Sequence, residues 1–129
     1  MQMHVEKFAA RYNGNCVIRP YGFVHNVEVM MSASDCIISK PGGLTVSEAL
    51  AKNLPMLLAD PIPGHEERNV DFLVNNGMAA LITKHFPVDE AVYELFTNPV
   101  RLETVRHTMK AVAHPDATER LADFVLALK

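Results

Sequence analysis

The sequence is poor in cysteine, with only Cys16 and Cys36 among its 129 residues. Each cysteine opens a short apolar run, so we expect two buried, reduced thiols rather than a disulfide. Reduced thiols are typical of a reducing compartment, and we therefore expect a cytoplasmic chain.

The sequence also lacks a cluster of lysine or arginine and carries a net charge of −3. The absence of a basic cluster argues against nucleic acid as the main partner. No apolar run approaches the length of about 20 residues that a membrane span needs. The first seven residues lack the apolar region of a signal peptide.

Several motifs of metal and nucleophile chemistry are missing. The six histidines form no His-x-His or His-Glu-x-x-His pattern, and residues 65–69 stop short of the latter at their last position. We therefore expect neither a metal nor another cofactor. No serine occupies an elbow-type turn, which leaves hydrolase chemistry unsupported. The glycines fit neither a Walker loop nor a dinucleotide fingerprint.

What the sequence does contain is a regular alternation of apolar strands and helices, of a length that suits one domain. Such an alternation predicts an α/β fold with a parallel sheet covered on both faces. The predicted strands are 16–19, 36–39, 55–59 and 79–82. The predicted helices are 1–12, 27–33 (capped by Asn26), 45–52, 66–76, 88–96, 98–112 and 116–128.

A glycine turn follows the second predicted strand and leads into helix 45–52. Gly42 and Gly43 have no Cβ, so a phosphate can approach the backbone there, and the amides that open the helix favour an anion. One helical turn further on, the Glu48 carboxylate can accept hydrogen bonds from two ribose hydroxyls. The alternative is a capping box, in which Glu48 bonds back to the helix start beside Thr45.

Ligands of such folds bind at the carboxyl ends of the strands. Three polar loops are predicted to converge there: residues 22–26, 40–45 and 60–69. This convergence favours the ligand-binding interpretation of Glu48 over the capping box.

Residues 34–50, Ser-Asp-Cys-Ile-Ile-Ser-Lys-Pro-Gly-Gly-Leu-Thr-Val-Ser-Glu-Ala-Leu, resemble the donor-binding segment of two-domain (GT-B) glycosyltransferases. The resemblance is strongest to the group that holds the peptidoglycan-precursor N-acetylglucosaminyltransferase, monogalactosyldiacylglycerol synthases and processive diacylglycerol glucosyltransferases. Residues 61–69, Pro-Ile-Pro-Gly-His-Glu-Glu-Arg-Asn, favour the glycolipid synthases. The resemblance implies a partial Rossmann-like, doubly wound parallel sheet, with residues 1–129 as a partial nucleotide-sugar-binding domain.

The resemblance also implies a role for each matching position. The main chain of Val24 would meet the uracil base, and Glu48 would bind the ribose. The diphosphate would lie against Gly42, Gly43, Leu44 and Thr45, and the donor sugar would face Gly64, His65, Glu66 and Asn69. Glycolipid synthases usually carry glutamine where His65 stands, so the hexose is left open.

The resemblance implies transfer of a sugar from a UDP-hexose to a lipid acceptor such as diacylglycerol, at the inner face of the membrane. In that family an N-terminal acceptor domain supplies the catalytic base, and two further strands precede the segment seen here. The chain alone is therefore expected to be inactive and to need that domain on the same or another chain. The alternatives are a non-catalytic UDP-sugar-binding subunit and a fragment of a sugar-nucleotide epimerase of GT-B type.

Overall fold

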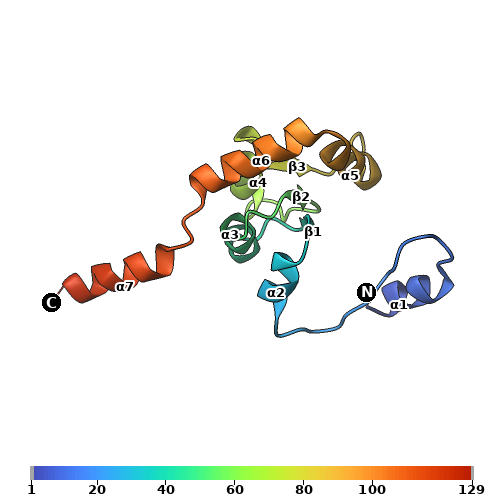
Figure 1. The fold of residues 1–129 in the computed structure, drawn as a ribbon, viewed down its shortest axis with the longest axis horizontal. Coiled ribbons are helices and arrows are strands. Elements are labelled where there is room, and N and C mark those ends of the chain that lie inside the picture. The colour runs from blue at the N-terminus through green and yellow to red at the C-terminus, as the bar shows by residue number, and fades with distance from the viewer. Residues whose placement is uncertain (1, 129) are drawn as a thin grey trace.

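A three-stranded parallel sheet forms the centre of the fold in the computed structural model, which describes residues 2–128. The strands β1 (Ile37–Ser39), β2 (Met56–Leu58) and β3 (Ala79–Leu81) lie in the order β1-β2-β3. Ile37 pairs with Met56, and Met56 with Ala79, so the strands start level with one another. The predicted α/β class and parallel sheet are confirmed (Figure 1).

Seven helices accompany the sheet in the described part of the chain. They are α1 (Gln2–Arg11), α2 (Val27–Ser32), α3 (Gly43–Ala51), α4 (Glu67–Asn75), α5 (Val88–Thr97), α6 (Pro99–Val112) and α7 (Ala117–Ala127). Every predicted helix is confirmed to within two residues at the ends that can be compared. Met1, where the first helix was expected to begin, lies outside the described residues. Within residues 2–128 no helix has the length and apolar character needed to cross a bilayer.

The core forms on both faces of β2, because the side chains of a strand alternate between the two faces. Met56 and Leu58 pack in a cluster with side chains of α3, α4 and α6. Leu57, between them, packs on the other side against Ala91 and Leu95 of α5. All three residues of β2 are buried, as expected of a central strand in a parallel sheet.

The predicted strand 16–19 is wrong. Residues 12–26 contain neither helix nor strand, and Val17 is 79% exposed. A strand is stable only where a neighbour accepts its backbone hydrogen bonds, and the sheet begins at β1. Cys16 is therefore exposed, and its thiol donates to the Tyr12 hydroxyl at 3.1 Å.

Cys36 agrees more closely with the expectation of a buried, reduced thiol. Cys36 is a free, half-buried thiol directly before β1. Burial, with a smaller contribution from the Asp35 carboxylate, raises the pKa of the Cys36 thiol. A raised pKa keeps the thiol protonated and unreactive near neutral pH.

Helix α2 begins where predicted, but the Asn26 side chain does not cap it. The backbone carbonyl of Asn26, rather than its side chain, receives the amides of Val29 and Met30 at 3.1 and 3.2 Å. Met31 on this helix is buried, whereas Val27 and Met30 are exposed.

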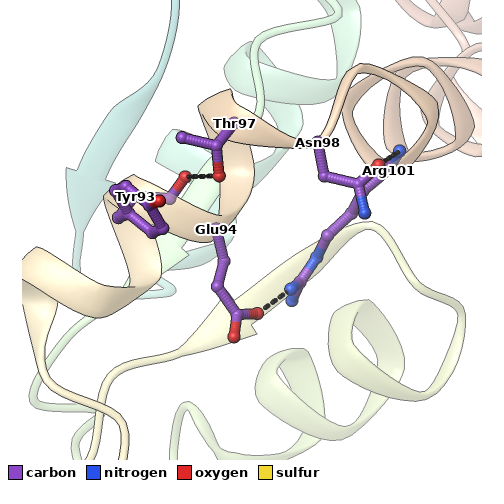
Figure 2. A network of polar contacts seen from close by, with 5 residues as sticks. All are labelled: Tyr93, Glu94, Thr97, Asn98 and Arg101. Atoms are coloured by element: carbon purple, nitrogen blue, oxygen red, sulfur yellow. Dashed lines mark hydrogen bonds and ion pairs between the residues drawn. The ribbon is translucent and has the colours of Figure 1, made fainter.

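The corner between α5 and α6 is set by Asn98 and the proline that follows it. The Asn98 side chain accepts from the backbone amide of Arg101 at 3.1 Å, and Pro99 occupies the first helical position. Figure 2 shows the Arg101 guanidinium turned back to an ion pair with Glu94 on α5. Both side chains are partly exposed, so the pair contributes at most about 1 kcal/mol.

The first and last helices stand away from the sheet, at opposite ends of the molecule (Figure 1). Helix α7 buries none of its residues, and Leu121 and Phe124 are both more than 60% exposed. The elements that pack around the sheet therefore lie between α2 and α6.

Candidate functional site

The glycine turn joins the carboxyl end of β1 to the start of α3. Pro41 is buried, and Gly42 caps the helix in an extended conformation, with φ −65° and ψ 142°. The Gly42 carbonyl accepts the first helical hydrogen bond, from the Val46 amide at 2.9 Å. The amides of the first helical turn have no partner inside the helix, and they carry the positive end of its dipole. This end of α3 can therefore bind an anion.

The backbone itself does not require glycine at this turn. Among the glycines of the described residues, Gly64 and Gly77 have a positive φ, whereas Gly42 and Gly43 do not. A Cβ built on Gly43 would meet open space, and one on Gly42 would lie an ordinary 3.5 Å from the Glu66 carboxylate. The fold thus tolerates side chains here, and the two glycines leave the backbone of the turn open to close approach by a ligand.

Glu48 lies at the sixth position of α3, because the helix begins at Gly43 rather than at Thr45. A capping box requires Thr45 to precede the first helical residue, so the capping-box alternative is wrong. Leu44 and Glu48 are four residues apart, hence on one face of the helix, and both are exposed. The Glu48 carboxylate is therefore available beside the helix start.

The loop before α4 is attached to the glycine turn. The Asn69 side-chain amide donates to the Pro41 carbonyl at 2.8 Å. The Glu66 carboxylate accepts from the Ile62 amide at 2.7 Å, which closes the loop, and its other oxygen lies beside Gly42. Two of the three loops predicted to converge are thus brought together at the carboxyl ends of β1 and β2.

The four residues assigned to the donor sugar differ in their surroundings. Gly64 and His65 are exposed, and Gly64 has a φ of +79°, which favours glycine. Glu66 and Asn69 are partly buried and already make the hydrogen bonds that hold the loop. Gly64 and His65 are consequently the members of this set that a ligand can reach without breaking a contact.

Val24 is not brought to the glycine turn. It lines an apolar pocket of about 230 Å³ with Cys36, Ile37 and Leu54. Cys36 and Leu54 precede β1 and β2, so this pocket lies at the amino-terminal end of the sheet. Because strand 16–19 does not form, the sheet does not fix the position of Val24.

The sequence offered no signal for the role of Pro41, whose carbonyl anchors the second loop. The contact joins residues 28 positions apart, and neither residue type specifies the other. Within residues 2–128 no group of three or more His, Cys, Asp or Glu side chains could hold a metal ion.

Replacing Asn69 by alanine is expected to lower the free energy of unfolding by about 0.5–1.5 kcal/mol, the net value of one hydrogen bond. The Pro41 carbonyl loses its donor, and the loop loses its attachment to the turn. Urea denaturation measures the change. Asn75→Ala, at an exposed position on the same helix, is the control, and an equal effect of both substitutions would show that the Asn69 contact contributes nothing.

Comparison with known proteins places this geometry in a family. Residues 2–121 match the family model described as the glycosyltransferase family 28 C-terminal domain. A processive diacylglycerol beta-glucosyltransferase of Bacillus cereus (strain AH187) is 31% identical over 110 residues, which cover 85% of this chain and 28% of the relative. The corresponding enzyme of Bacillus pumilus (strain SAFR-032) is 34% identical over 95 residues, covering 74% of this chain and 25% of the relative.

Among solved structures, MurG of Acinetobacter baumannii superposes with a TM-score of 0.74 at 26% identity, covering 98% of this chain and 39% of that one. The fold is the partial Rossmann-like C-terminal half of a GT-B glycosyltransferase that the sequence predicted. The chain spans little more than a quarter of the length of the curated relatives it matches. Because the family model covers residues 2–121, nearly the whole chain, the protein belongs to the family of glycosyltransferase family 28 C-terminal domains.

Proposed function

We propose that the chain is the UDP-sugar-binding part of a hexosyltransferase that moves a sugar from UDP-hexose to a lipid acceptor such as diacylglycerol. The observation that carries the proposal is the pair of glycines at the start of α3, where a side chain would meet open space at Gly43 and only an ordinary contact at Gly42. The names of the relatives, diacylglycerol glucosyltransferases, support the lipid acceptor. The reaction takes place at the cytoplasmic face of the membrane, where such an acceptor lies.

The diphosphate lies against the first turn of α3 in this proposal. The acceptor oxygen bonds to the anomeric carbon, the bond from that carbon to the diphosphate breaks, and UDP leaves with the electron pair. The amides of Gly43, Leu44 and Thr45 stabilise the negative charge that develops on the leaving group. The helix start supplies the positive charge that a metal ion would otherwise provide.

Placing the diphosphate at the start of α3 also assigns the contacts of the ribose and the sugar. The Glu48 carboxylate binds the ribose hydroxyls, and the loop with Gly64, His65, Glu66 and Asn69 faces the sugar. The position of Val24 at the other end of the sheet gives no support to its contact with uracil. The base that accepts the proton of the acceptor hydroxyl belongs to an acceptor domain outside these residues, so the chain alone does not complete the transfer.

Glu48→Gln is expected to lower the affinity for UDP by about tenfold or more. Two hydrogen bonds to a charged acceptor are worth about 1.5–3 kcal/mol each, glutamine recovers part of this, and about 1.4 kcal/mol corresponds to tenfold. The substitution keeps the shape of an exposed side chain, so stability should not change. Titrations of UDP and 2′,3′-dideoxy-UDP, each followed by NMR, measure the effect.

The wild-type chain should prefer UDP over its dideoxy analogue, and the Glu48→Gln variant should retain only a small part of that preference. Glu28→Gln, an exposed change on α2, is the matched control and should retain the preference. If wild type and Glu48→Gln prefer UDP to the same degree, Glu48 is not part of the nucleotide site.

A further inference from the structure

A second pocket lies at the end of the sheet opposite the glycine turn. It has a volume of about 600 Å³ and is walled by the end of α2, the end of α3, the residues before β2, and one side of α6. Pockets that hold small molecules are typically about 300–1,000 Å³. The pocket is therefore large enough for a phosphate ester.

The wall of this pocket is unusually basic for a chain with a net charge of −3. Lys52 directly follows α3, and α6 contributes Arg106, His107 and Lys110. Glu103 is the only carboxylate among the lining residues. Residues 103, 106, 107 and 110 follow the spacing of one helical face, so their side chains gather on the same side of α6.

Two polar atoms of this wall are buried without a hydrogen-bond partner among the described residues: Nε of Arg106 and Oδ1 of Asn53. Asn53 is held in the left-handed region, with φ 51°, between α3 and β2. Leaving a buried donor and a buried acceptor unpaired is unfavourable. Both atoms have almost no accessible surface, so they can meet an occupant of the pocket only when their side chains rotate toward it. An occupant that then accepts from Arg106 and donates to Asn53 removes that cost.

We propose that this pocket binds a phosphate ester whose alcohol portion carries a hydroxyl group. Lys52, Arg106 and Lys110 bind the phosphate, because cations that line one pocket suit a charged group with several acceptor oxygens. The hydroxyl donates to Asn53. The proposal is independent of the donor site, since the glycine turn lies beyond the other end of β1.

The probe is sn-glycerol 3-phosphate, titrated into the isotope-labelled full chain at constant ionic strength and followed by NMR. Saturable shifts are expected at the amides of Lys52, Asn53, Arg106 and Lys110. Lys52→Gln/Lys110→Gln replaces two exposed side chains and should weaken binding by about tenfold or more, because two charge-assisted hydrogen bonds are lost.

Lys7→Gln/Lys84→Gln is the control, because it makes the same change in net charge at two other exposed lysines. It should leave the affinity within about twofold, the small effect expected of screened distant charges.

Three results would overturn the proposal: no saturable binding, an equal loss in both double variants, or shifts confined to residues 43–45. Sedimentation with phosphatidylglycerol–phosphatidylcholine vesicles then identifies the source of the ester. Vesicle binding that Lys52→Gln/Lys110→Gln abolishes supports a lipid headgroup. Binding of glycerol phosphate without vesicle binding supports a soluble ester in the same pocket.

Discussion

Replacing Gly43 by alanine is expected to abolish UDP binding while leaving the protein as stable as before, or more stable. A Cβ at this position meets open space within the protein, and alanine in a helix is favoured over glycine by about 0.5–1 kcal/mol. The same Cβ occupies the space through which a phosphate reaches the amides of α3. A hundredfold loss of affinity corresponds to about 2.8 kcal/mol, and we expect at least that loss.

Gly77→Ala is the matched control and should show the opposite behaviour. Gly77 follows α4 with a φ of +68°, a conformation that costs a residue with a side chain about 1–2 kcal/mol. This variant should therefore be less stable but should bind UDP normally. Thermal unfolding and UDP titration of both variants separate the two roles of glycine. Unchanged UDP binding in Gly43→Ala would remove the turn from the nucleotide site.

Leu73→Ala is expected to lower the free energy of unfolding by about 2–5 kcal/mol, the range observed when a buried leucine is truncated. Leu73 lies on α4, has no exposed surface, and packs in the larger core cluster between α4 and β2. Small domains are stable by only about 5–15 kcal/mol, so this single change removes a large part of the total. Urea denaturation followed by circular dichroism measures it.

Phe72→Ala is the control for this prediction, because Phe72 is the adjacent residue on α4 and is 46% exposed. Although phenylalanine is the larger side chain, its truncation should cost less than that of Leu73. An equal or greater loss for Phe72→Ala would mean that α4 presents a different face to the sheet.

The helices and the three central strands could be predicted because their signals are local. The apolar run at 55–59 and the Asn76-Gly77 stop after α4 each specify an element without reference to the rest of the chain. The glycine turn was placed correctly between β1 and α3 for the same reason. The ability of the turn to bind an anion follows from the free amides at the start of the helix, and the sequence also indicates where that helix starts.

The wrong prediction, strand 16–19, and the features that the sequence did not reveal all depend on residues far apart in the chain. The run Cys16-Val17-Ile18 has the composition of a strand, but in the described residues no neighbouring strand pairs with it. The contact between Asn69 and Pro41 and the basic pocket of Lys52 with α6 join residues far apart in the sequence. Composition along the chain shows no basic cluster, because these cations come together only when α3 packs against α6.

UDP titrated into the isotope-labelled chain, at concentrations up to several millimolar, shows whether the diphosphate of a UDP-sugar binds at the start of α3. NMR follows every backbone amide during the titration. Saturable shifts are expected to be largest at Gly43, Leu44 and Thr45, with smaller shifts at Glu48 and in residues 64–69. Saturation with the largest shifts at any other place in the fold, or no shift at residues 43–45, would contradict binding at the start of α3.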